Sequence, residues 1–467
     1  MLHLTVVIAA AGAPEVAVPH LVWTLPFLLL LLAIAVLPLV PRASHWWEHN
    51  RNKLLVSVAF GVLILCHYAG RSFGFEVRGA RTAPGLKTLA AVSEHAILRD
   101  YVPFIALLAS LYVISGGVRL TGDLRARPRL NTAFLALGAL LASLIGTTGA
   151  SMILIRPLIQ TNQERKHVRH TIVFFIFLVS NIGGCLLPVG DPPLFLGYLK
   201  GVPFLWTLGL ILPWLFCVAT LLAVYYAWDK VAYRREDPRD LARDDTIYEP
   251  PRLRGAINLV WLAGIVLSVA LIVPHRALPG TDLVVGEFVR EAVMLGLVVL
   301  SLVTTPRGLR AEVEFSYGPI AEVACLFLGI FLTMQVPIEI LQARGSELGL
   351  KSPAHFFWAS GSLSSVLDNA PTYAVLFEAA KALSVSAHGP IVKLLDGGVI
   401  QANLLTALSL GSVFMGANTY IGNGPNFMVK SIAERQGIAM PSFFGYMLYS
   451  GCVLLPLFVI VTVVFCR

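Results

Sequence analysis

Two acidic residues, Asp191 and Asp368, lie inside long apolar stretches that glycine and proline interrupt. A charged group at bilayer depth costs roughly 2.5–3.5 kcal/mol, so such a residue is expected to be functional or paired. A carboxylate can bind a proton or supply oxygen ligands to a hard cation such as sodium. Asp191 also precedes Pro192, so a purely structural role as the N-cap of a half-helix is open too.

Neutral amide and hydroxyl side chains gather at the same interruptions. Groups of this kind bind a dehydrated sodium ion or an anionic carboxylate equally well, helped by exposed carbonyls or by helix N-termini respectively. The plainer alternative is that each hydroxyl bonds the carbonyl one turn earlier in its own helix. The candidates are Asn369, Thr372, Asn418, Thr419, Asn423 and Asn426 at the breaks, and Thr147, Thr148 and Ser151 at another glycine-rich point.

A few further charged residues lie in apolar surroundings. Arg156, five residues after Ser151, could pair with a membrane carboxylate, bind an anionic substrate or extend its charge to the interface. Glu378 and Lys381 are spaced i, i+3, which predicts that they pair with each other. Glu322 is a weaker candidate for coupling.

The composition indicates what kind of molecule positions these groups. The chain has 467 residues, 57% hydrophobic and 13% charged, with a mean hydropathy of +0.76. A soluble protein carries roughly twice that charged fraction, so we predict an all-α polytopic membrane protein. The net charge of +8 spreads over loops and predicts no nucleic-acid partner.

Motifs of several protein classes are missing from the sequence. No Walker loop, HExxH pair or nucleophile elbow is present, so we expect a protein that is not an enzyme and has no cofactor beyond a coupling ion. All six cysteines lie in apolar stretches, which predicts core thiols rather than a disulfide or a zinc site. A cleaved signal is not expected, and residues 1–21 are ambiguous.

The apolar stretches divide the chain into two similar halves. SLIGTTGASM (143–152) aligns with SSVLDNAPTY (364–373), and GCLLPVGDPP (184–193) with GANTYIGNGP (416–425). We predict about ten transmembrane helices plus two re-entrant hairpins and two broken helices, with the halves inverted, as in secondary transporters with a midplane site. The first repeat is 1–228 (hairpin 131–161, broken helix 171–199), the charged cytoplasmic linker is 229–255, and the second repeat is 256–467 (hairpin 355–382, broken helix 401–430).

The motifs SNIGGCLLPVGDPP, SSVLDNAPTY and GANTYIGNGPNF resemble the broken helices and hairpin of the ion-transporter superfamily. This superfamily includes NhaD-type sodium/proton antiporters, arsenite permeases and citrate or dicarboxylate carriers, and the chain most resembles its bacterial group of citrate transporters or sodium:proton antiporters. The resemblance implies a multi-pass protein of the plasma (bacterial inner) membrane and a possible homodimer. It also implies a transport site lined by Asn181, Asp191, Asp368, Asn369, Asn418 and Asn423.

The chain departs from the superfamily's dicarboxylate carriers at its hairpin tips. Those carriers show Ser-Asn-Thr at both tips, whereas this chain has Thr-Thr-Gly-Ala-Ser and Asp-Asn-Ala-Pro-Thr. Asp368 would repel a carboxylate substrate unless sodium or a proton neutralised it, which favours cation exchange.

The resulting hypothesis is a sodium/proton antiporter in which Asp191 and Asp368 alternate between proton and sodium. The alternative is sodium- or proton-coupled symport of citrate or a dicarboxylate, with Arg156 and the hairpin hydroxyls holding the anion. A membrane scaffold or receptor is disfavoured by the doubled helix breaks. The expected partners are therefore a small inorganic ion or small carboxylate and the lipid bilayer.

Overall fold

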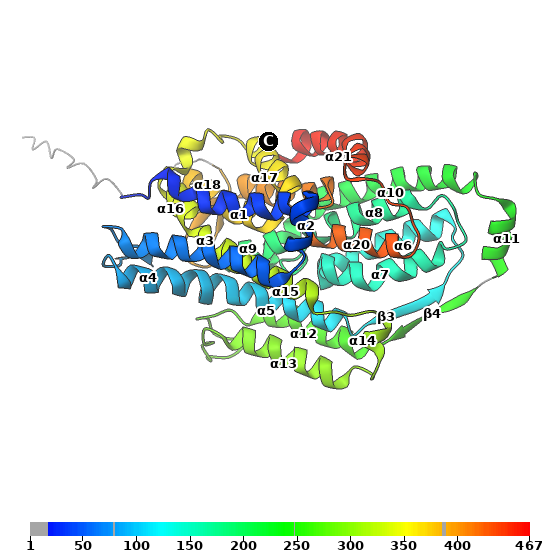
Figure 1. Ribbon diagram of the computed structural model, residues 1–467, viewed down its shortest axis with the longest axis horizontal. Coiled ribbons are helices and arrows are strands. Elements are labelled where there is room, and N and C mark those ends of the chain that lie inside the picture. Colours follow the sequence, from blue (N-terminus) through cyan, green and yellow to red (C-terminus); the bar gives the residue numbers. More distant parts are fainter. Residues whose placement is uncertain (1–16, 78–79, 247, 385–388) are drawn as a thin grey trace, which may run out of the picture.

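The computed structural model describes residues 17–467 apart from 78–79, 247 and 385–388. Most of the ambiguous segment 1–21 therefore lies outside the described residues. The described chain is built almost entirely of helices, most of which run along the long axis of the molecule (Figure 1). The helices of the first half are α1 (Leu25–Val36), α2 (Pro41–Trp47), α3 (Asn50–Gly70), α4 (Leu86–Ser93), α5 (Val102–Ser115), α6 (Pro128–Ile145), α7 (Thr147–Thr161), α8 (Arg169–Leu178), α9 (Pro192–Leu199), α10 (Ile211–Tyr233) and α11 (Pro238–Thr246).

The second half follows with the same alternation of long apolar helices and short turns. Its helices are α12 (Ile257–Leu271), α13 (Val289–Thr304), α14 (Leu309–Glu312), α15 (Gly318–Thr333), α16 (Gln335–Arg344), α17 (Pro353–Val366), α18 (Asn369–Ser384), α19 (Ala402–Phe414), α20 (Gly424–Arg435) and α21 (Phe443–Phe465). Several of these helices leave large apolar side chains exposed, such as Leu212, Val303 and Leu448. An apolar outer surface of this kind is what contact with lipid requires.

Five of the described helices are long and apolar enough to cross a membrane, or up to seven if each bent pair counts as one span. The molecule is therefore a multi-pass membrane protein. One of the five, Leu86–Ser115, continues from α4 through a π-helical segment, Glu94–Tyr101, into α5. The full number of ten spans stays a prediction.

Within the described residues, three short antiparallel strand pairs accompany the helices: β1 (Glu76–Val77) with β2 (Ala80–Arg81), β3 (Arg119–Asp123) with β4 (Glu249–Arg254), and β5 (Ile391–Lys393) with β6 (Val399–Gln401). The β3–β4 pair lies with α11 at one end of the molecule (Figure 1). In its register, Arg119 lies opposite Arg254 and Asp123 opposite Glu249. The predicted linker therefore folds back onto the first half through a strand.

The interior is formed by the interrupted helices. Every residue of α8 from His170 to Leu178 is buried, as are residues 179–191 after it. α17 packs on α19, and α18 packs on α9, which joins elements of both halves. Cys185, Cys217 and Cys466 are buried as predicted, but Cys66 and Cys452 are exposed, because they lie on helix faces that turn away from the core.

Candidate functional site

Two helices are interrupted where the sequence places glycine and proline. α8 ends at Leu178 and α9 begins at Pro192, with a short 3₁₀ turn, Ile182–Cys185, between them. α19 ends at Phe414, a second 3₁₀ turn follows, and α20 begins at Gly424. We call residues 179–191 the first break and residues 415–423 the second break. Each break frees backbone groups that must find partners inside the protein.

Close backbone approach explains why both breaks contain paired glycines. A Cβ on Gly190 would lie 2.3 Å from the carbonyl oxygen of Gly184. A Cβ on Gly422 would lie 2.5 Å from the carbonyl oxygen of Gly416. Real Cβ atoms do not approach backbone so closely, so no larger residue fits at Gly190 or Gly422 without moving the chain.

Asp191 is the acidic group at the end of the first break, and its side chain is only 1% exposed. Its Oδ1 accepts hydrogen bonds from Thr147 Oγ1 at 3.0 Å and from Asn423 Nδ2 at 3.1 Å. Its Oδ2 accepts a hydrogen bond from Asn369 Nδ2 at 2.6 Å. The carboxylate is thus held by three neutral donors that come from three different segments of the chain.

Those donors come from two helical hairpins and from the second break. Gly146, with φ +83°, turns the chain between α6 and α7, so that Thr147 begins α7 beside Asp191. Thr147 also donates its backbone N–H to the carbonyl of Gly190 at 2.9 Å. Asn369 begins α18 at the equivalent turn after α17. The four interrupted segments therefore meet at one carboxylate.

Two further asparagines join the breaks to each other. Asn181 Nδ2 donates to Asn426 Oδ1 at 2.7 Å and to the carbonyl of Ile176 at 2.8 Å. Asn426 Nδ2 in turn donates to the carbonyls of Gly416 and Thr419, at 2.8 and 2.9 Å. These amides satisfy backbone groups that the breaks would otherwise leave unpaired.

The remaining candidates of the second half lie around the tip of the α17–α18 hairpin. Asp368 is half-buried, and its Oδ1 accepts the backbone N–H of Ala370 at 3.1 Å. Thr372 Oγ1 donates to the Asp368 carbonyl at 3.3 Å. Asn418 Nδ2 donates to Ser365 Oγ, and Thr419 Oγ1 to the Ser365 carbonyl. Asp368 thus neighbours the Asp191 cluster through Asn369.

The remaining candidates of the first half lie along α7. Ser151 Oγ is 2.9 Å from Ser180 Oγ, which ties α7 to the first break. Thr148 is half-buried near the helix start. Arg156 Nη2 lies 3.4 Å from Glu314 Oε2, and Arg156 lines a cavity of about 320 Å³ away from the breaks. Arg156 lies nine positions after Thr147, about 13 Å along the helix axis, so Arg156 does not join the Asp191 cluster.

Some buried oxygen atoms near the breaks have no hydrogen-bond partner among the described residues. They are Asn181 Oδ1, Asn369 Oδ1 and Asn418 Oδ1. Buried unpaired acceptors are costly and suit a cation that needs oxygen ligands. No cluster of three or more His, Cys, Asp or Glu side chains suited to a metal ion occurs within the described residues.

Several ion pairs join residues on different elements, and local spacing in the sequence did not predict them. Glu378 Oε1 accepts from Lys200 Nζ at 2.6 Å, and Lys381 Nζ lies 3.0 Å from Asp396. The predicted pairing of Glu378 with Lys381 is therefore wrong, because each residue finds a closer partner on another element. Glu322 pairs with Lys53 at 2.6 Å.

Another missed cluster centres on Asp229, which the sequence placed in the linker. Asp229 ends up inside α10 and binds Arg165 at 2.6 Å and His170 at 2.9 Å, and the Arg165 and Asp229 side chains are fully buried. A hydrophilic segment gave no sign that its first residue belongs to the preceding helix.

Comparison with known proteins supports one assignment. A family model described as "Putative citrate transport" matches residues 16–466. The search of curated proteins gave no match.

Proposed function

The chain belongs to the putative citrate transport family, and from that premise we propose that it is a secondary transporter that exchanges sodium for protons at Asp191. One observation carries the proposal: a buried carboxylate lies where four interrupted segments meet, and its hydrogen-bond donors are all neutral. A carboxylate held in this way keeps its negative charge available to a proton or a cation. An enzyme active site is not part of the proposal, and the only cofactor is the transported ion.

Neutralisation of the carboxylate is the step that couples the two ions. Binding of a proton or of sodium removes the net charge of Asp191, and a neutral site costs less to move through a low-dielectric region than a charged one. The empty carboxylate, in contrast, stays bonded to Thr147, Asn369 and Asn423. We propose that Asn369 Oδ1, which has no partner, supplies a second oxygen to the sodium ion.

We further propose that the halves are inverted repeats. Asp191 caps α9 with φ −146° and ψ 143°, and Asn423 caps α20 with φ −152° and ψ 141°. The spacing of six residues between Gly184 and Gly190 recurs between Gly416 and Gly422. Two copies of one motif that meet at a shared site favour alternating access, in which one bundle moves against the other.

Citrate or dicarboxylate symport is the second candidate, because the family description names citrate. In this reading Asp191 and Asp368 bind the coupling ion, while the hydroxyls of Thr148 and Ser151 hold the carboxylate substrate. Arg156, which faces its own cavity beside Glu314, would attract the anion on its way to the site. Both candidates place the protein in the bacterial plasma membrane.

Transport by the purified full chain in lipid vesicles separates the candidates. Dissipation of a pH gradient by added sodium, without any organic acid, is expected for exchange, whereas uptake of labelled citrate is expected for symport. Asp191→Asn should abolish either activity. Asp368→Asn tests the second carboxylate, and unchanged exchange in that variant would leave Asp191 as the single titrating group. If the unmodified protein showed no sodium-dependent proton movement and no citrate uptake, the proposal would be overturned.

A further inference from the structure

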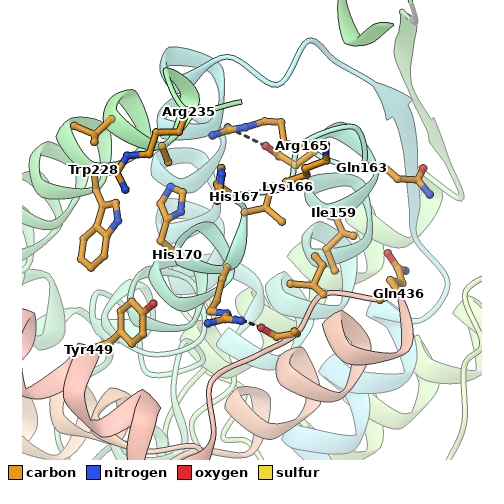
Figure 2. A pocket seen from close by; sticks show the side chains of 18 residues that line it. Ile159, Gln163, Arg165, Lys166, His167, His170, Trp228, Arg235, Gln436 and Tyr449 are labelled. Carbon is orange, nitrogen blue, oxygen red and sulfur yellow. Dashed lines mark hydrogen bonds between the residues drawn. The ribbon is translucent and has the colours of Figure 1, made fainter. Parts of the chain in front are cut away.

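A second cavity, of about 740 Å³, lies at the ends of α7, α8, α10 and α20 (Figure 2). We call it the basic cavity, because six of its lining residues are Arg165, Lys166, His167, Arg169, His170 and Arg235, and no Asp or Glu of the described chain lines it. It lies far from the transport site. α7 runs from Thr147 beside Asp191 to Thr161 beside this cavity, which is about 21 Å along the helix axis.

Two buried carboxylates hold the loop that forms one wall of the basic cavity. Asp229 binds both Arg165 and His170, and its side chain is fully buried. Glu236 accepts the backbone N–H groups of Lys166 and His167 at 2.9 and 2.8 Å. The loop that carries the basic residues is therefore held in place, and Asp229 already balances the charge of Arg165.

The other cations are left to face the cavity. Arg169 gives its Nε–H to the carbonyl of Ala439 at 2.6 Å, which orients the side chain and leaves its two terminal nitrogens free of that bond. Arg235, His167 and Arg169 have no carboxylate within ion-pair distance in the part of the chain that the structure describes. Lys166 pairs with Asp240 at 3.0 Å on the surface. The cavity thus carries an excess of positive charge.

Aromatic side chains place one side of the cavity at the membrane interface. The rings of Trp228 and Tyr449 stack with centroids 5.6 Å apart, and both line the cavity (Figure 2). Exposed apolar residues continue from them, including Val231 on α10 and Leu448 on α21. Tryptophan and tyrosine favour the headgroup level of a bilayer, next to lipid chains.

We propose that the basic cavity binds the phosphate group of an anionic ligand, and that this ligand is a membrane phospholipid. The arginines and His167 would contact the phosphate, because guanidinium groups match its oxygens in pairs. The acyl chains would lie along the apolar faces of α10 and α21. Basic pockets between membrane helices are suited to such headgroups. The site is independent of the transported ion, so it stands or falls separately from the proposed function.

The test uses the full chain in neutral detergent and follows its thermal unfolding. Phosphatidylglycerol is expected to raise the unfolding temperature at lower concentration than phosphatidylcholine, inorganic phosphate or citrate at equal ionic strength. Arg235→Gln should raise the half-saturating concentration of phosphatidylglycerol about fivefold, and Arg169→Gln with Arg235→Gln about 25-fold. Arg234→Gln is the matched control, because Arg234 is exposed and adjacent but does not line the cavity; we expect less than a twofold change.

Each other result counts against the proposal. Equal responses to phosphatidylglycerol and phosphatidylcholine, or equal effects of Arg234→Gln and Arg235→Gln, would overturn it. A response to inorganic phosphate but not to the lipid would assign the phosphate to a soluble ligand and overturn the lipid source. A preference for citrate would mean that the cavity is a vestibule for substrate. Should the double variant fail to fold, Arg235→Gln alone decides, because the Arg235 side chain makes no hydrogen bond or ion pair to the described chain.

Discussion

The two breaks have similar backbone geometry but differ in charge. The residue that caps the following half-helix has nearly the same dihedral angles in both, yet it is Asp191 in the first break and Asn423 in the second. The two side chains face each other, and Asn423 Nδ2 donates to Asp191 Oδ1 at 3.1 Å. One position of a repeated motif thus supplies the acceptor, and its counterpart supplies the donor.

This difference indicates why only one of the two cap positions carries a buried carboxylate. Carboxylates at both caps would lie within hydrogen-bond distance, where two negative charges repel strongly in a low dielectric. The amide keeps the shape of a carboxylate while it donates a hydrogen bond. The similar cap geometry of the two breaks therefore positions both side chains, and the unequal pair decides the charge of the candidate site.

The largest effect should come from removing that charge. Asp191→Asn keeps the size of the side chain but abolishes the group that a proton or sodium binds, so we expect transport in vesicles to fall at least 100-fold. Asn423→Asp in the same chain returns a carboxylate on the opposite cap, and partial recovery of exchange would show that the two caps are interchangeable. Normal transport by Asp191→Asn would disprove the carboxylate mechanism.

Next in size are the effects of filling the tight turns. Gly190→Ala and Gly422→Ala each force a Cβ against a carbonyl oxygen, and we expect each to lower the free energy of unfolding by about 1–3 kcal/mol. Similar losses at both positions, measured by thermal unfolding in detergent, would support equal geometry in the breaks. Gly424→Ala is the control, because nothing lies within 4 Å of its Cβ position. A loss at only one of the two glycines would break the comparison.

Glycine and proline act locally on the backbone, so a sequence can indicate where helices are interrupted. The segment 131–161 contains most of α6 and all of α7, and the segment 401–430 contains α19 and the start of α20. The candidate site followed from the same signal, since Asp191, Asn369 and Asn423 stand next to the breaks. The contacts between these residues depend on the tertiary structure, however, and no spacing along the chain predicts that Asn423 contacts Asp191.

Ion pairs and strand pairs between elements that are distant along the chain could not be predicted from the sequence. Lys200 and Glu378 are 178 residues apart, and only the packing of α9 on α18 brings them together. Local spacing instead suggested Lys381 as the partner of Glu378, although an i, i+3 pair stabilises a helix by only about 0.2–0.5 kcal/mol and yields to a better-placed partner. The strand β4 was hidden for a similar reason, because its pairing with β3 depends on a contact across more than 100 residues.

The donors around Asp191 should have smaller, graded effects. Asn423→Ala and Asn369→Ala each remove one charge-assisted hydrogen bond, and we expect each to slow exchange about tenfold. Equal effects would mean that the second break and the second hairpin hold the carboxylate to the same extent. Asn403→Ala, at the start of α19 and outside the cluster, is the control and should change exchange less than twofold.

The smallest expected effect comes from Asp123, a carboxylate at the end of the molecule and outside the candidate site. Burial raises the pKa of Asp123 in β3 to about 6, helped by the negative charges of Glu164, Asp244 and Glu249. Between about pH 4 and pH 6, the folded protein therefore keeps a proton on Asp123 that the unfolded chain, with a pKa near 3.8, has already lost. Stability should consequently fall as pH rises from about 4 to about 6 and stay low above that, by roughly 1 kcal/mol after solvent screening.

Asp123→Asn tests whether Asp123 causes this pH dependence of stability. It also tests whether Asp123 contributes to the pH dependence of exchange, which the comparison of the two breaks assigns to Asp191. Because the amide does not titrate, the variant should lose the fall in unfolding temperature between pH 4 and pH 6 while its exchange in vesicles keeps the original pH profile. If the pH profile of exchange changed instead, Asp123 would contribute to the proton dependence. The pH dependence could then no longer be assigned to Asp191, and the charge difference between the two breaks would not by itself explain coupling.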